Sequence, residues 1–102
     1  MKFGLSELVI SELCKVFSRH ANVENVLIFG SRAKGCYREG SDIDLAVIGK
    51  WLNYSELQRI QMEIDELEML YTVDLLNYST VAATPIGEHI DRVGQVFYQA
   101  VA

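Results

Sequence analysis

The sequence predicts an α/β fold of the α+β kind, in which helices pack on a mixed β-sheet of three to four strands. Apolar runs and helical periodicities follow one another in the order helix, strand, strand, helix, strand, helix. Half of the 102 residues are apolar, which is enough to fill one core. The single proline and seven glycines are scattered, so no linker is indicated. We therefore expect one domain over residues 1–102.

The first half of the chain contains a helix and two strands. Apolar residues at helical spacing from Leu5 to Phe17 predict an amphipathic helix that ends near Arg19 and His20. Residues 23–29 read as a strand buried on both faces, and residues 43–48 as a second, short strand. The link between the strands is marginal for a parallel crossover, so we expect an antiparallel pair.

A long helix and a third strand follow. Ser55 is the expected N-cap of the helix, whose apolar stripe is Leu57, Ile60, Ile64 and Leu67. Residues 72–78 predict the third strand.

The last helix has clear boundary signals, but the tail after it does not. Thr84 and Pro85 suit the N-cap and first position of a helix that runs to about Arg92, and Gly94 is expected to stop it. Residues 95–98 fit either a short edge strand or a helix remnant, and the pattern does not decide between them.

Composition excludes several classes of protein. A net charge of −5 argues against a protein that coats nucleic acid, so no direct nucleic-acid binding is expected. Two cysteines are too few for a disulfide framework. No apolar run approaches the roughly 20 residues that cross a bilayer, so we expect a cytoplasmic protein without membrane contact.

The pair Gly30-Ser31, followed after ten residues by Asp42-Ile43-Asp44, is the main chemical motif. Residues two apart in a strand share a face, so Asp42 and Asp44 would project together, roughly 6.6 Å apart. Paired carboxylates can each reach a divalent ion, and two such ions, with Mg²⁺ the natural choice, clamp the oxygens of a phosphoryl transfer. Asp-x-Asp alone would instead favour an ordinary turn in which Asp42 caps Gly40-Ser41.

Other residues around the motif suit nucleotide chemistry. The Gly30-Ser31 turn offers a hydroxyl and backbone N–H groups to phosphate, and Arg32 is a candidate to neutralise a triphosphate. Asp74 stands between apolar residues of the third strand, where a carboxylate is costly unless it is paired, metal-bound or at the open end. It is a candidate third metal ligand, or the base for an incoming hydroxyl.

These segments together resemble the DNA polymerase beta-like nucleotidyltransferase superfamily, and more narrowly its small MNT-type, or minimal nucleotidyltransferase, branch. The resemblance rests on residues 29–35, 40–45, 73–75 and 90–98. It implies that Asp42 and Asp44 are metal ligands, that Asp74 is the third catalytic and metal-binding carboxylate, and that Gly30 and Ser31 hold the nucleotide phosphates. The implied reaction transfers a nucleoside monophosphate, with AMP from ATP expected, to an acceptor hydroxyl with two Mg²⁺ ions and release of pyrophosphate.

The resemblance also implies a partner. A chain of 102 residues has no room for the helical domain that covers the base in larger relatives, so a second polypeptide or a second copy, as in a homodimer, would complete the site. Small proteins of this branch resemble antitoxins that modify a tyrosine of an all-helical HEPN-type ribonuclease toxin with AMP. Two alternatives stay open: an antitoxin that binds nucleotide but acts by steric masking, and adenylylation of a small molecule such as an aminoglycoside.

Overall fold

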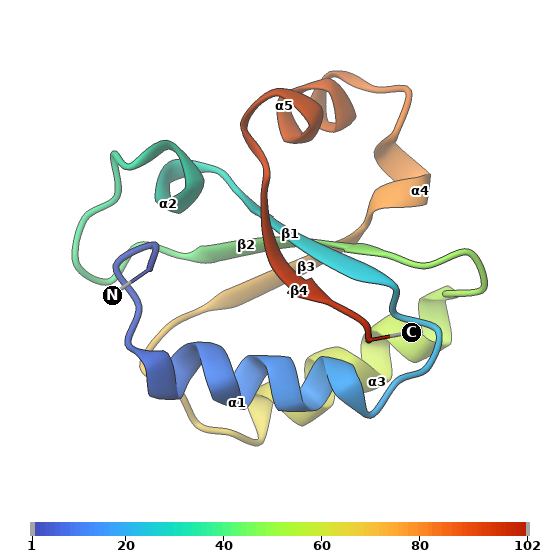
Figure 1. Cartoon of the computed structure of the whole chain (residues 1–102), viewed down its shortest axis with the longest axis horizontal. Helices are drawn as coiled ribbons and strands as arrows, with labels where there is room; N and C mark the ends of the chain where they lie inside the picture. The colour runs from blue at the N-terminus through green and yellow to red at the C-terminus, as the bar shows by residue number, and fades with distance from the viewer. Residues whose placement is uncertain (1, 102) are drawn as a thin grey trace.

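The computed structural model describes residues 2–101 and contains a four-stranded mixed sheet with helices on both faces (Figure 1). Its elements, in chain order, are α1 (Glu7–Ser18), β1 (Asn25–Phe29), α2 (Ser31–Lys34), β2 (Ile43–Ile48), α3 (Tyr54–Asp65), β3 (Val73–Asn77), α4 (Tyr78–Val81), α5 (Pro85–Val93) and β4 (Gln95–Gln99). The predicted mixed α/β fold is confirmed. None of the helices in the described part of the chain is long and apolar enough to cross a membrane.

The strands lie in the order β3-β2-β1-β4. β1 pairs antiparallel with β2, as the short link between them predicted, and β2 pairs parallel with β3. β4 pairs antiparallel with β1, so the undecided segment after Gly94 is an edge strand. β3 forms the opposite edge of the sheet.

The main core lies between the sheet and the pair α1 and α3, which cover the same face (Figure 1). In β2 the alternate residues Ile43, Leu45 and Val47 are buried in this core, together with Phe17 of α1 and Ile60 of α3. Each such side chain stabilises the fold by about 1.5–3 kcal/mol relative to exposure. Because side chains alternate along a strand, the residues between them, Asp44 included, point to the other face.

Helix α3 begins two residues earlier than predicted. The N-cap is Asn53, whose side-chain oxygen accepts a hydrogen bond of 2.9 Å from the Glu56 N–H, so the assignment of Ser55 as N-cap is wrong. Leu52 and Leu57, which flank this turn, are both buried in the core, a hydrophobic staple that sets the point of entry. Burial of Leu52 in the core therefore favours a helix start at Asn53 over one at Ser55.

The other helix boundaries agree with the sequence or add to it. Thr84 caps α5 by accepting from the Gly87 N–H at 3.3 Å, Pro85 is its first residue, and Gly94 ends it, all as predicted. The short helix α4 was not predicted, and its N-cap is Asn77. Figure 1 shows α4 and α5 on the face of the sheet opposite α1 and α3.

Replacement of the two candidate caps tests the start of α3. We expect Asn53→Ala to lower the free energy of unfolding by about 1 kcal/mol, because the Glu56 N–H loses its acceptor. Ser55→Ala, in the first turn, should stay within about 0.5 kcal/mol of the parent. Urea denaturation of the three proteins measures both values, and equal losses would contradict the observed cap.

Candidate active site

The pairing of β2 with β3 brings two of the predicted aspartates side by side. Asp44 is the parallel neighbour of Asp74, and on its other side Asp44 pairs with Phe29, the last residue of β1. Neighbouring strands are about 4.8 Å apart, so the two carboxylates start from adjacent backbone positions. Asp42 lies one residue before β2 and is exposed, as is Asp74, whereas Asp44 is partly buried.

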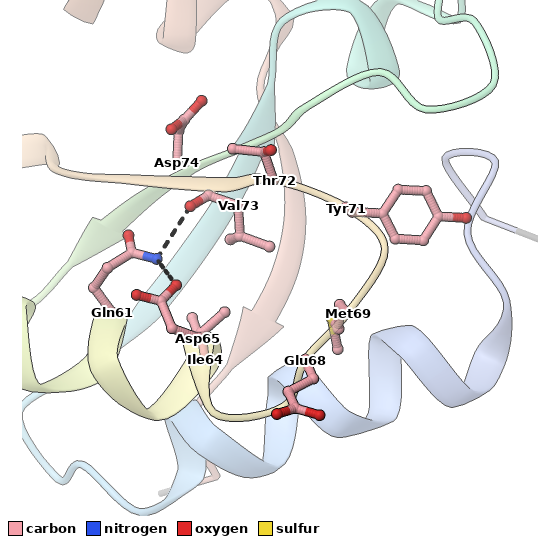
Figure 2. A pocket seen from close by; sticks show the side chains of 9 residues that line it. All are labelled: Gln61, Ile64, Asp65, Glu68, Met69, Tyr71, Thr72, Val73 and Asp74. Atoms are coloured by element: carbon pink, nitrogen blue, oxygen red, sulfur yellow. Dashed lines mark hydrogen bonds between the residues drawn. The ribbon is translucent and has the colours of Figure 1, made fainter.

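The Asp74 side chain lies on the face away from α3. Figure 2 shows it on the opposite side of the β3 ribbon from Gln61 and Asp65, whose side chains face the strand from the helix. Gln61 donates hydrogen bonds to the Val73 carbonyl at 3.2 Å and to Asp65 at 3.1 Å, which holds the helix against the strand. The Asp74 carboxylate therefore projects from the side of β3 opposite these contacts.

Gly30 forms the wall of the site next to Asp44. Its φ of +74° and ψ of −154° lie in a region that only glycine adopts readily, and a Cβ at this position would stand 2.5 Å from Asp44 Oδ2. Ser31 follows as the first residue of α2. The predicted Gly-Ser turn thus meets one of the predicted carboxylates, that of Asp44, although the two are separated in the sequence.

Asp44 lies in the electrostatic field of two other carboxylates, those of Asp74 and Asp42. Burial raises the pKa of Asp44 above its ordinary value of 3.8, and the charges of Asp74 and then Asp42 raise it further. Within residues 2–101, none of the three forms an ion pair with Lys, Arg or His. Acidic groups held together in this way are typical of functional sites.

Arg32 follows Ser31 in α2, and its side chain is buried. Its side chain is only 3% exposed, and the guanidinium donates to main-chain carbonyls: Nε and Nη2 to Ser41 at 3.1 and 2.8 Å, and Nη1 to Phe3 at 2.8 Å. The rings of Tyr37 and Tyr71 lie 5.2 and 5.0 Å from its Cζ. The guanidinium therefore makes its contacts within the protein, and its predicted contact with a triphosphate stays a prediction.

A cleft of about 450 Å³ adjoins Asp44 and Asp74, within the size range of small-molecule sites. It is lined by Phe29, Asp44, Asp74, Leu75, Leu76, Pro85, Ile86 and His89. The His89 ring meets the Phe29 ring edge-on, with centroids 6.4 Å apart. The sequence reasoning missed the contribution of α5, although Pro85, Ile86 and His89 have the spacing of one helix face.

A second cavity, of about 410 Å³, lies between α3 and the start of β3. Figure 2 shows its lining residues, which include Gln61, Asp65, Glu68 and Tyr71. Asp74 is the only predicted site residue that borders it. The cleft under α5, which contains both Asp44 and Asp74, is therefore the better candidate for substrate binding.

A family model described as "Polymerase beta, Nucleotidyltransferase" matches residues 11–101, which is most of the chain. The chain belongs to the polymerase beta nucleotidyltransferase family. This confirms the resemblance inferred from the Gly30-Ser31 and Asp42-x-Asp44 spacing. No curated protein sequence matches the chain at a significant level.

Solved structures share the nucleotidyltransferase fold. A crystal structure described as a toxin-antitoxin with AMP-PNP superposes with a TM-score of 0.68 and 22% identity, covering 94% of this chain and 75% of that chain. The toxin-antitoxin MntA-HepT gives a TM-score of 0.67 and 18% identity, covering 93% of this chain and 74% of that chain. At these identities the similarity shows the fold.

The residues of this nucleotidyltransferase suit a magnesium site in their chemistry. Three carboxylates supply the hard oxygen ligands that Mg²⁺ prefers, and Gly30 leaves open the space beside Asp44 that a Cβ would fill. In residues 2–101 no three Asp, Glu, His or Cys side chains are already grouped as a metal site. Asp42 and Asp74 are exposed, so their side chains are free to rotate toward a cation.

Gly30→Ala tests the contact between the turn and Asp44. We expect a loss of about 2–3 kcal/mol in the free energy of unfolding, because the substitution combines backbone strain with a collision. Gly35→Ala is the matched control: its φ is +80°, but a Cβ there would meet nothing within 4 Å, so only about 1 kcal/mol should be lost. Chemical denaturation gives both numbers, and a smaller loss at Gly30 than at Gly35 would contradict the geometry.

The raised pKa of Asp44 makes a prediction about pH. A carboxyl whose pKa is higher in the folded state binds its proton more tightly there, so stability falls as the pH rises through that pKa. In metal-free buffer, Asp44→Asn should therefore be more stable than the parent at about pH 7, and the gain should shrink towards about pH 3. Urea denaturation across this range checks the sign, and a variant that is less stable at neutral pH would refute it.

Proposed function

We propose that this nucleotidyltransferase moves AMP from ATP to an acceptor hydroxyl, a tyrosine of a HEPN-type toxin, and thereby acts as an antitoxin. The observation that carries the proposal is the alignment of Asp44 with Asp74 against the Gly30 turn, where neither carboxylate forms an ion pair within residues 2–101. Adjacent carboxylates repel one another. This arrangement is expected where a divalent cation and a triphosphate bind and balance the negative charge.

Asp42, Asp44 and Asp74 are the residues that would hold two Mg²⁺ ions. When bound, these ions neutralise the triphosphate and clamp the attacking and leaving oxygens. The turn at Gly30-Ser31 lets phosphate oxygens approach the backbone closely, since Gly30 has no side chain there. A triphosphate held at this turn would lie next to the cleft under α5, because Asp44 borders both the turn and the cleft.

Asp74 is suited to accept the proton of the acceptor hydroxyl, because it is exposed and borders the cleft. The hydroxyl oxygen then forms a bond to the α-phosphorus of ATP, and the bond from that phosphorus to the bridging oxygen breaks. Pyrophosphate leaves with the bonding electrons. The products are an AMP ester of the acceptor and pyrophosphate.

The shape of the cleft and the structural relatives support a protein acceptor. Phe29, Leu76 and Ile86 provide an apolar lining next to the two carboxylates, which suits an aromatic ring that carries a hydroxyl. Three solved structures that share the fold are described as toxin-antitoxins, one of them with AMP-PNP and one a mutant with two aspartates replaced by glutamate. A helical toxin that inserts a tyrosine over α5 would also exclude water from the reaction.

Transfer of label from α-³²P-ATP tests the reaction. The chain is incubated with Mg²⁺ and a candidate HEPN-type partner protein, and label on the partner is quantified. We expect Asp42→Asn, Asp44→Asn and Asp74→Asn each to lower transfer by about 100-fold or more, because each removes a metal ligand or the base. Asp65→Asn is the matched control, since Asp65 lies on the other side of β3, and should transfer within about twofold of the parent.

Two outcomes would contradict the proposal. Label that persists in Asp42→Asn or Asp44→Asn would show that the assigned carboxylates do not act. Full protection from toxicity by a chain with both residues replaced, without transfer, would instead indicate steric masking of the partner.

A further inference from the structure

We infer that Arg32 is a positioning residue that holds Asp42 and Asp74 in place beside the Gly30-Ser31 turn; this inference rests on the proposed function. The group involved consists of the Arg32 guanidinium, the rings of Tyr37 and Tyr71, and the carbonyls of Phe3 and Ser41. We call it the arginine clasp. Its contacts distinguish it from an arginine that binds phosphate directly.

The clasp touches every chain segment that carries a predicted site residue. Arg32 itself follows Ser31 in α2. Its two hydrogen bonds to the Ser41 carbonyl fix the residue directly before Asp42. The Tyr71 ring, 5.0 Å away, belongs to the residue three positions before Asp74. One side chain therefore connects α2 with the segments that lead into the two strands, next to Asp42 and Asp74.

The loop before Asp42 has few other connections. Gly35 and Gly40 both have positive φ, and the hydrogen bonds that shape the loop join nearby residues: Cys36 to Ser31, and Arg38 to Ser41. The hydrogen bonds from Arg32 to the Ser41 carbonyl span nine positions in the sequence and connect this end of the loop to α2. Without them, Asp42 would be anchored from the strand side alone, where the Ile43 N–H donates to the Thr72 carbonyl at 2.9 Å.

The N-terminal turn completes the clasp from the other side. The Phe3 carbonyl accepts from Arg32 Nη1 at 2.8 Å, and the Leu5 N–H closes the turn on the Lys2 carbonyl at 2.8 Å. Gly4 has a φ of +72°, and a Cβ there would collide with the Tyr37 ring. The turn and the ring therefore fit together only with glycine, and they enclose the guanidinium.

The clasp uses the planar fork of arginine rather than its charge alone. All three hydrogen bonds go to neutral carbonyls, and the guanidinium Cζ lies 5.2 and 5.0 Å from the centroids of the Tyr37 and Tyr71 rings. Lysine keeps the charge but cannot bond two separate carbonyls from a planar group between rings. Arg32→Lys therefore separates a positioning role from simple neutralisation of a triphosphate.

Two measurements on Arg32→Lys test the inference, with Arg59→Lys on the exposed surface of α3 as the matched control. Hydrogen exchange of the metal-free protein should speed up over residues 38–44 by about tenfold, since the loop loses its tether. Mn²⁺ binding in the presence of AMP-PNP, followed by electron paramagnetic resonance, should weaken by about 10–100-fold. Arg59→Lys should change neither value. In Arg32→Lys, the affinity for AMP-PNP without metal should stay within about threefold of the parent.

A second pair of variants covers the case in which Arg32→Lys does not fold. Tyr71→Leu removes one ring of the clasp and should weaken Mn²⁺ binding, whereas Tyr71→Phe keeps the ring and should not.

Unchanged exchange over residues 38–44, or unchanged Mn²⁺ affinity, in Arg32→Lys would overturn the inference. So would a loss confined to metal-free AMP-PNP binding, which would assign Arg32 to the phosphates. A parent chain that binds neither Mn²⁺ nor AMP-PNP would overturn the proposed function, while the exchange data would still decide whether the clasp holds the loop.

Discussion

The pairing of β2 with β3 is the constraint on which the rest of the site depends. The alternation that buries Ile43, Leu45 and Val47 against α1 and α3 also turns Asp44 to the opposite face, beside Asp74. A slip of one residue would exchange the two faces and bury the carboxylates in the core. The apolar core therefore holds two like charges together, and the molecule tolerates the repulsion because the register is fixed by burial.

Around this pair of aspartates, Gly30 leaves space for a side chain, and contacts of Arg32 link the neighbouring chain segments. Gly30 has no Cβ where Asp44 Oδ2 needs room, so the turn and the carboxylate can meet. The buried guanidinium of Arg32 links α2 to the segment before Asp42 and to the residue that leads into β3. The result is an acidic group at the edge of an open apolar cleft, an arrangement that suits a triphosphate and a second substrate.

Features that depend on neighbouring residues could be predicted from the sequence, and those that depend on distant residues could not. The strand over residues 43–48, the antiparallel hairpin and the Thr84-Pro85 helix start were all predicted, because each has a local pattern. The cap of α3 was wrong because burial of Leu52 decided between Asn53 and Ser55. Tail residues 95–99 form a strand only because β1 offers a free edge.

The same division applies to the site. The family and the proximity of Asp44, Asp74 and Gly30 were expected from motif spacing, whereas the position of Arg32 depends on Phe3, Tyr37 and Tyr71, which lie far from it in the sequence or carry no distinguishing pattern. The contribution of α5 to the cleft was also missed, since it requires the path of the chain after β3.

The most direct test of the central claim is a crystal structure of the protein with Mn²⁺ and AMP-PNP, in which anomalous scattering locates the metal. The account predicts metal peaks among Asp42, Asp44 and Asp74, with the triphosphate against the Gly30-Ser31 turn. Metal and nucleotide in the cavity between α3 and β3, next to Asp65 and Glu68, would contradict it.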